Sequence, residues 1–220
     1  MASVGAMTRP ILHDYWRSSA SYRVRIALNM KEVEYDRVSV NLASGEQLDD
    51  AYRAQNPQGF VPMLEIDGEC IAQSFAIIGY LEATRPGPRS LPADPAAAAH
   101  VGALALTVAC DIHPLNNLRV LQYLTGPLGQ DEEAKSAWIS RWISDGFTAL
   151  EAMAAPRAGR FLFGDEPTLA DICLVPQMYN ARRFGVPLED YPLLVRADAE
   201  ATALPAFAVA HPDAIAAATA

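Results

Sequence analysis

The stretch VPMLEIDGECIAQSFAIIGYLE, residues 61–82, decides the fold of the first part of the chain. Two short β-type runs flank an Asp-Gly pair, which is typical of a tight hairpin turn. A Gln-Ser pair then precedes an apolar helical pattern, and serine is a favoured helix N-cap. The predicted elements are a strand at 61–66, a turn at Asp67 and Gly68, a second strand at 70–72 and a helix at 74–82 with Ser74 as its N-cap.

The residues ahead of this unit read as strand, helix and strand. The apolar run at 10–14 predicts a strand, the pattern at 21–30 a helix, and the alternating β-branched run at 35–40 a second strand. The order is therefore β-α-β, an irregular segment, then β-β-α. This order predicts a small mixed sheet flanked by helices.

The chain changes character after residue 86. Four prolines between residues 86 and 95 predict a linker, and no strand pattern occurs beyond them. Helical patterns cover residues 96–124, 132–154, 168–184, 192–203 and 205–211. The predicted fold class is α/β plus all-α, a mixed N-terminal domain followed by an all-helical C-terminal domain.

Five segments follow from this division of the chain. Residues 1–9 are expected to be disordered or an added extension, and Met7 is a candidate start with residues 1–6 added ahead of it. An Ala-rich C-terminal end is expected to be frayed. The remaining boundaries are 10–86 for the N-terminal domain, 87–95 for the linker, 96–212 for the helical domain and 213–220 for the frayed tail.

Composition narrows the class of protein. The 220 residues carry a formal net charge of −9, which disfavours nucleic acid or an anionic membrane as the main partner. No apolar run is expected to reach the roughly 18 residues of a membrane-spanning helix. The three widely spaced cysteines favour a reduced cytoplasmic protein without disulfides and without a metal site.

Residues 16–22, Trp-Arg-Ser-Ser-Ala-Ser-Tyr, lie at the predicted junction between the first strand and the first helix. Helix N-termini present unpaired N–H groups and a partial positive charge, so a hydroxyl there can cap the helix or bind an anion. From spacing alone, Ser18 or Ser19 is an ordinary N-cap. A thiolate held at this place would have a lowered pKa, and the chain offers no cysteine of its own there.

Two further places could bind a ligand. Pro62 at a strand start cannot donate to the ladder, and a cis peptide would turn the backbone of Val61 outward, although a trans peptide is the commoner form. Gln73 and Ser74 at a helix start could bind a carboxylate, or Ser74 could be only a cap.

The helical half offers three more candidates. Asp171 stands at capping-box spacing after Thr168 and is interpreted as a structural cap. His113, beside the helix-kinking Pro114, could be a general base, although a structural hydrogen bond is the preferred interpretation. The basic pair ending in Arg183 is typical of a solvated helix C-terminus.

Together these sites resemble the zeta class of cytosolic glutathione transferases, which includes maleylacetoacetate isomerases. The similarity runs in register from about residue 10 to residue 212. The stretches that carry it are residues 17–28, 56–62, 73–78, 112–118 and 164–177. The resemblance implies a thioredoxin-like N-terminal domain, a helical C-terminal domain, glutathione as cofactor and a homodimer.

The resemblance also implies roles for individual residues. Ser18 would stabilise the glutathione thiolate, supported by Ser19, and Arg17 and Arg183 would bind the acidic substrate. The glutathione-binding residues would be Ser18, Val61, Pro62 in the cis form, Gln73, Ser74, His113 and Asn117. No metal is implied.

Two positions depart from the family pattern. Many class members have cysteine directly after the serine pair, where this chain has Ala20, so any role that needs that thiol is absent. His113 replaces a glutamine seen in some members, and the surrounding sequence also looks like that of bacterial maleylpyruvate isomerases.

The implied activity is glutathione-dependent cis–trans isomerisation of maleylacetoacetate to fumarylacetoacetate in aromatic amino acid breakdown, by thiolate addition, bond rotation and elimination. Maleylpyruvate isomerisation and transfer to, or dehalogenation of, small α-halo acids are alternatives within the class. Outside enzymes, a non-catalytic glutathione-binding module is the alternative.

Overall fold

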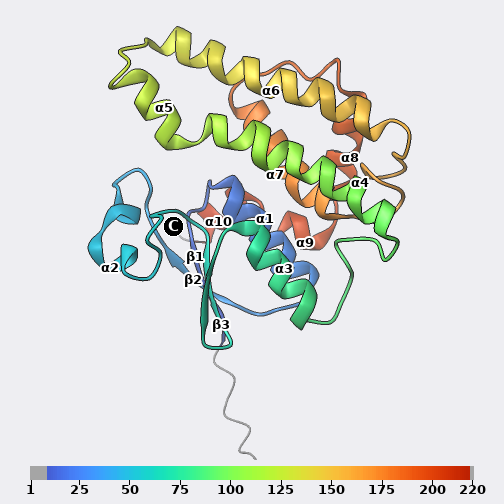
Figure 1. The fold of residues 1–220 in the computed structure, drawn as a ribbon, viewed down its shortest axis with the longest axis horizontal. Coiled ribbons are helices and arrows are strands. Elements are labelled where there is room, and N and C mark those ends of the chain that lie inside the picture. The colour runs from blue at the N-terminus through green and yellow to red at the C-terminus, as the bar shows by residue number, and fades with distance from the viewer. Residues whose placement is uncertain (1–8, 219–220) are drawn as a thin grey trace, which may run out of the picture. The chain divides into compact units, whose positions relative to one another are not determined.

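A computed structural model of the chain describes residues 9–218 (Figure 1). Most of the expected extension 1–9 and the last two residues of the expected tail lie outside the described residues. The chain divides into two compact units, one formed by Met1–Pro88 with Pro205–Ala220 and the other by Arg89–Leu204. Each unit is described by itself.

The first unit holds a four-stranded mixed sheet in the order β2-β1-β3-β4. Strand β1 pairs in parallel with β2 and antiparallel with β3, and β3 pairs antiparallel with β4. The strands are β1 (Ile11–Asp14), β2 (Asp36–Ser39), β3 (Met63–Ile66) and β4 (Glu69–Ala72), and the helices are α1 (Ser19–Met30), the single turns η1 (Glu46–Leu48) and α2 (Asp50–Arg53), and α3 (Ser74–Thr84). The predicted order β-α-β, irregular segment, β-β-α is confirmed.

The strand register brings the ends of three strands to the same end of the sheet. His13 near the end of β1 lies opposite Met63 at the start of β3, and Met63 lies opposite Ala72 at the end of β4. The residues that follow β1, precede β3 and follow β4 therefore emerge at the same end of the sheet. The hairpin between β3 and β4 turns at Asp67 and Gly68, whose φ angles of 54° and 85° fit the predicted Asp-Gly turn.

The C-terminal segment belongs to the first unit, which differs from the expected boundary at residue 212. Helix α9 (Pro205–Ala208) packs against α1, and α10 (Pro212–Ala217) follows it. The amide of Asn29 donates to the Ala206 carbonyl at 3.0 Å, and Ile215 is buried. Side chains of α1 therefore bind this segment, and residues 213–217 form a helix where fraying was expected.

The second unit is helical, as predicted. Its centre is α7 (Leu169–Arg183), which packs against α4 (Pro95–Leu106) and α8 (Pro192–Thr202). The long α6 (Glu132–Ala154) has the predicted bounds. The expected linker has no helix or strand up to Asp94, but its Ser90 is buried and accepts a hydrogen bond from the Leu169 amide at 2.8 Å.

The helix expected at 96–124 is broken into four pieces. After α4 come a π-helical turn (Thr107–Ile112), a 3₁₀ turn (His113–Asn116) and α5 (Leu118–Thr125). Pro114 has no N–H to continue the helical ladder. Gly146 of α6 admits the side chain of Ile112, because a Cβ on Gly146 would lie 2.3 Å from Ile112 Cγ1.

By length and composition alone, Pro95–Thr125 is apolar enough to cross a membrane, with a mean hydropathy of 1.5 in its most apolar window. The expectation that no such stretch exists is wrong by this measure. A single stretch of this kind is weak evidence for a membrane, since the core helix of a soluble protein passes the same test.

Asp171 is a buried cap, as predicted. Its carboxylate accepts hydrogen bonds from the backbone of Leu162 at 3.0 Å and of Thr168 at 2.8 Å, and from the Thr168 hydroxyl at 3.0 Å. Thr168 in turn caps the first turn of α7, completing a capping box. Burial raises the pKa of Asp171 above its usual value, and these hydrogen bonds oppose the shift.

This raised pKa predicts a stability trend with pH. The folded protein binds a proton at Asp171 at a higher pH than the unfolded chain, where aspartate titrates near ~3.9. The free energy of unfolding of the wild type, minus that of Asp171→Asn, should therefore grow as pH falls from neutral through the raised pKa and level off below about 4. Denaturant titrations across this range measure it. A difference that stays constant over this pH range would contradict the raised pKa of Asp171.

Gln73 connects β4 to α3 with an unusual backbone. Its φ of 71° lies in the left-handed region, where a side chain costs about 1–3 kcal/mol. Gln73 stands at the N-cap of α3 and makes no side-chain capping bond, so the prediction that Ser74 is the N-cap is wrong by one residue.

We expect Gln73→Gly to have a free energy of unfolding about 1 kcal/mol higher than Gln73→Ala. Glycine removes the strain, and its greater freedom in the unfolded chain offsets only part of that gain. Both variants lose the amide, so the comparison isolates the backbone. Equal stabilities in chemical denaturation would show that the backbone at this position is unstrained.

Candidate active site

The first part of the site is the N-terminus of α1. Ser18 is the N-cap, and its Oγ accepts a hydrogen bond from the Ser21 amide at 3.2 Å. Because this bond uses Oγ only as an acceptor, the hydroxyl hydrogen stays available to donate, and within residues 9–218 it has no acceptor. No acidic side chain lies in the first turn, so the positive end of the helix dipole is not neutralised there.

A tight turn delivers Ser18 to this position. The Ser18 amide donates to the Tyr15 carbonyl at 2.9 Å, which closes a turn over Tyr15, Trp16, Arg17 and Ser18. The Arg17 guanidinium lies over the Trp16 ring, 5.1 Å from its centre. Ser19, the first residue of α1, is buried. The three predicted residues Arg17, Ser18 and Ser19 therefore follow one another from the end of this turn into the start of α1.

The second part is the segment just before β3. The Val61–Pro62 peptide bond is cis, as the family resemblance implied. Val61 is buried, and none of the hydrogen bonds among residues 9–218 uses its backbone N–H or carbonyl. A buried backbone pair without partners fits an extended peptide ligand, which would pair with it as an added strand does.

The third part is the N-terminus of α3. The Gln73 amide is exposed and donates to Gln58 Oε1 at 2.5 Å. The Ser74 side chain is buried, and its hydroxyl receives a hydrogen bond from Arg23 at 3.5 Å. The first turn holds no acidic residue and the N-cap provides no acceptor, so these N–H groups fit a carboxylate from outside the chain.

These three parts lie at the same end of the sheet, where the strand register brings together the end of β1, the start of β3 and the end of β4. The arrangement fits an extended, acidic, peptide-like ligand with one anionic group at α3 and a second polarisable group at α1. The donor set is made of hydroxyl, amide and backbone groups, as such a ligand requires. Among residues 9–218, no group of three or more His, Cys, Asp or Glu side chains could hold a metal ion.

The remaining predicted residues lie in the second unit. His113 begins the 3₁₀ turn, and Asn117 is the N-cap of α5, where its Oδ1 accepts from the Arg119 amide at 3.2 Å. Arg183 is exposed at the C-terminal end of α7, with its guanidinium 4.5 Å from the centre of the Phe184 ring. Its place at a helix C-terminus was predicted, and this stacking contact was not.

The sequence did not single out three side chains that support the site. Gln58 contacts Gln73, Arg23 contacts Ser74, and Arg25 contacts the turn before Ser18. Both arginines are buried, and they lie within residues 17–28, which carry the family resemblance, without an assigned role. Their alternation with apolar residues was the signal, since a buried arginine requires a partner.

Comparison with known proteins identifies the chain's relatives. The family model for the glutathione S-transferase N-terminal domain matches residues 10–83, and that for the C-terminal domain matches residues 132–208. A probable maleylacetoacetate isomerase from Vibrio cholerae is 50% identical over 206 residues, covering 92% of this chain and 95% of the relative.

Two solved structures are also similar. The holo structure of a maleylpyruvate isomerase, a bacterial zeta-class glutathione transferase, is 50% identical with a TM-score of 0.91 and covers 93% of this chain and 97% of its own. A maleylacetoacetate isomerase from Methylobacterium extorquens AM1, solved with bound malonate and glutathione, is 40% identical with a TM-score of 0.89, covering 92% and 96%. With both family models matched and such identity over nine-tenths of the chain, this protein belongs to the zeta class of the glutathione S-transferase family, together with the maleylacetoacetate isomerases.

Proposed function

We propose that this protein is a glutathione-dependent isomerase that converts maleylacetoacetate to fumarylacetoacetate. One observation carries the proposal. The N-termini of α1 and α3, neither with an acidic residue in its first turn, lie at the same end of the sheet as the unpaired backbone of Val61. Relatives that are about 50% identical over nearly the whole chain bear this name, which supports it further.

Glutathione fits the three parts of the site. Its γ-glutamyl carboxylate would lie on the N–H groups of α3, next to Gln73 and Ser74. Its cysteinyl peptide unit would pair with the backbone of Val61, ahead of Pro62. His113 and Asn117 are assigned to glutathione binding by position in the family alone.

Bound glutathione supplies a thiolate nucleophile that adds to the cis double bond and leaves after rotation. Ser18 keeps that sulfur ionised, because its hydroxyl donates towards it while Oγ is held by the Ser21 amide. The helix dipole of α1 acts in the same direction. Ser19, buried as the first residue of α1, supports this arrangement.

Two arginines are assigned to the acidic substrate. A guanidinium binds a carboxylate through two parallel hydrogen bonds, and it stabilises the negative charge that develops on the substrate carbonyl oxygen. Arg17 is adjacent to Ser18 in the turn, and Arg183 is exposed at the end of α7. Both guanidinium groups lie on aromatic rings, which restricts their orientation.

Maleylpyruvate is the second candidate substrate. The specific observation in its favour is the maleylpyruvate isomerase structure, which matches this chain with the same 50% identity and a TM-score of 0.91.

The remaining assignments concern the setting of the reaction. We place the protein in the cytoplasm, in tyrosine breakdown, as a homodimer without nucleic acid or membrane partners. The three cysteines are free, which suits a reducing compartment. Leu106 of α4 and Met153 of α6 are exposed in the second unit, and a second copy would cover such apolar side chains.

The direct test is an absorbance assay with maleylacetoacetate and maleylpyruvate side by side, each with and without glutathione. We expect turnover only with glutathione, and the higher kcat/KM for maleylacetoacetate. A higher kcat/KM for maleylpyruvate would establish the second candidate. Glutathione binding without turnover of either acid would contradict an isomerase and favour a binding module.

Ser18→Ala should reduce kcat at neutral pH about a hundredfold, because the variant loses the preorganised hydroxyl donor to the glutathione thiolate. The pH–rate profile should move to higher pH, since the bound thiol loses the group that lowers its pKa. Stopped-flow or steady-state rates across pH measure both effects.

Ser18→Thr is the matched control, because it keeps a hydroxyl and a capping oxygen. It should retain most of the activity and the wild-type pH profile. A Ser18→Ala profile identical to that of the wild type would remove Ser18 from the mechanism, whatever the loss in stability from the missing cap.

A further inference from the structure

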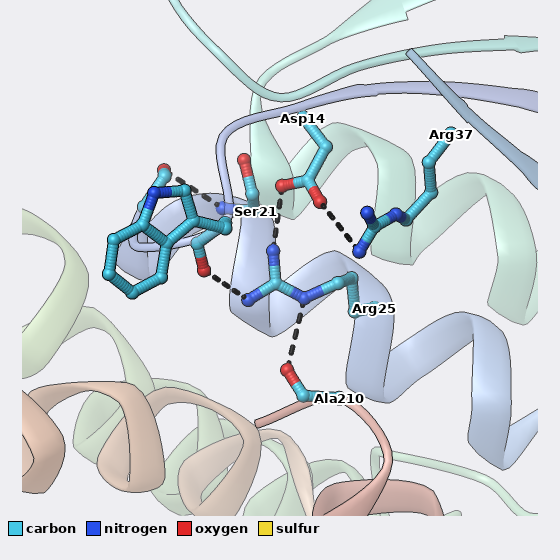
Figure 2. Close-up of polar contacts among 7 residues, drawn as sticks. Asp14, Ser21, Arg25, Arg37 and Ala210 are labelled. Atoms are coloured by element: carbon cyan, nitrogen blue, oxygen red, sulfur yellow. Dashed lines mark hydrogen bonds and ion pairs between the residues drawn. The ribbon is translucent and has the colours of Figure 1, made fainter. Parts of the chain in front are cut away.

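Arg25 is a fully buried cation that the proposed mechanism does not use. Its side chain is 0% exposed, at the centre of the first unit. Its Nη1 donates to Asp14 Oδ1 at 2.7 Å, Nη2 to the Trp16 carbonyl at 3.0 Å and Nε to the Ala210 carbonyl at 3.0 Å. Figure 2 shows the guanidinium between Asp14 on one side and Ala210 on the other.

The contact with Trp16 has a specific geometric meaning. Trp16 is the second residue of the four-residue turn that ends at Ser18, so its carbonyl belongs to the central peptide of that turn. The central peptide is the part that distinguishes turn types, since its reversal converts type I into type II without breaking the closing bond. A hydrogen bond from a buried guanidinium to this carbonyl selects one orientation.

The orientation of that peptide decides where the neighbouring groups point. Reversal would change ψ of Trp16 and φ of Arg17, and so would rotate the Arg17 side chain and the entry of the chain into Ser18. The Ser18 hydroxyl can stabilise the glutathione sulfur only from within hydrogen-bond distance. A displacement of Ser18 by about 1 Å would therefore weaken this interaction.

Arg25 is itself held from several sides. The carboxylate of Asp14 is buried, and its second oxygen lies 3.9 Å from Arg37 Nη1. The Ala210 carbonyl comes from the C-terminal segment, which α1 also binds through Asn29 and through the edge contact between Tyr22 and His211. Tyr22, Arg25 and Asn29 recur at helical spacing, so one face of α1 binds the C-terminal segment.

We infer that Arg25 is a positioning residue for the isomerase, which holds the central peptide of the Tyr15–Ser18 turn and thereby aims Ser18 and Arg17. The Ala210 carbonyl of the C-terminal segment holds the Arg25 guanidinium on the side opposite Asp14. This inference rests on the proposed function of Ser18. The role is indirect, because Arg25 is enclosed by protein groups and does not contact the ligand region.

Arg25→Lys tests the inference. Lysine keeps the positive charge beside Asp14, but a single ammonium lacks the planar fork needed to reach Asp14, Trp16 and Ala210 together. We expect kcat at neutral pH to fall about tenfold, the effect of losing one charge-assisted hydrogen bond. The pH–rate profile should move to higher pH, and KM for glutathione should stay within about a factor of two because α3 is unchanged.

Two readouts do not depend on turnover. The pKa of the bound glutathione thiol, followed by the ultraviolet absorbance of the thiolate, should rise in Arg25→Lys. In the protein without glutathione, hydrogen exchange of the Ser18 amide should become about tenfold faster, because the turn opens locally more often. A purely structural arginine would lower global stability without moving the thiol pKa.

Arg37→Lys is the matched control. It alters the other arginine beside Asp14 but leaves the turn alone, so the thiol pKa, the Ser18 exchange rate and kcat should equal those of the wild type. If Arg25→Lys does not fold, the uncharged pair Asp14→Asn with Arg25→Gln replaces it, since that pair leaves no unpaired buried charge. The same shift in thiol pKa is expected.

The outcomes separate the two proposals. A folded Arg25 variant with wild-type thiol pKa and kcat overturns the positioning role, while the proposed function stands as long as Ser18→Ala is impaired. A wild-type protein that binds no glutathione overturns both. A wild-type protein that binds glutathione with a lowered thiol pKa but isomerises neither acid overturns only the isomerase, and the thiol pKa of Arg25→Lys still decides the role of Arg25.

Discussion

The buried ion pair between Arg25 and Asp14 connects parts of the first unit that are far apart in the sequence. Removing two charges from water costs several kcal/mol per ion, and their mutual attraction offsets this only when the remaining donors are also satisfied. Arg25 meets that condition by donating to two backbone carbonyls in addition to the carboxylate. The pair therefore joins the end of β1, the turn before α1 and the C-terminal segment into one unit, and no apolar side chain could link all three. Burial lowers the pKa of Arg25, and the carboxylate beside it opposes that shift.

The net charge of the protein has the same sign as that of its proposed ligands. At −9, the chain repels acids on average, and both glutathione and the substrate are acidic. Two helix N-termini oppose this repulsion locally. Their partial positive charges are not neutralised, because neither α1 nor α3 has an acidic residue in its first turn. A helix terminus acts only within about one turn, so it can reverse the sign of the field at a site without altering the net charge. Arg17, next to Ser18 in the turn before α1, adds a full positive charge at the same short range.

Much of the fold could be predicted because its signals are local. The Asp67-Gly68 turn, the capping box of Thr168 and Asp171 and the apolar period of α6 each lie within a few residues, and all three were correct. Other features went unpredicted because they depend on long-range contacts. The sequence around Pro205 reads as one more helix, and nothing in it indicates that α1 binds it through Asn29. The kink at Pro114 was signalled locally, but the close contact of Ile112 with Gly146 of α6, 34 residues further along the chain, was not. For the candidate site, the places of Ser18 and Gln73 at helix starts could be predicted from the sequence, whereas Arg25 contacts backbone carbonyls that no sequence pattern records.

Overall similarity cannot separate the two candidate substrates, because relatives named for each share the same identity with this chain. The two acids have the same cis double bond, conjugated carbonyl and terminal carboxylates, and they differ by one methylene between a ketone and a carboxylate. One methylene in a binding pocket is worth only about 1–3 kcal/mol, or roughly 10–200-fold in kcat/KM. In the proposed site, the half that forms the thiolate would meet only the part that the two acids share. Discrimination would then come from the residues that receive the distal carboxylate. A misplacement of about 1 Å can change a rate about a hundredfold, so the position of one guanidinium, such as that of Arg183 on the Phe184 ring, would decide between the two acids.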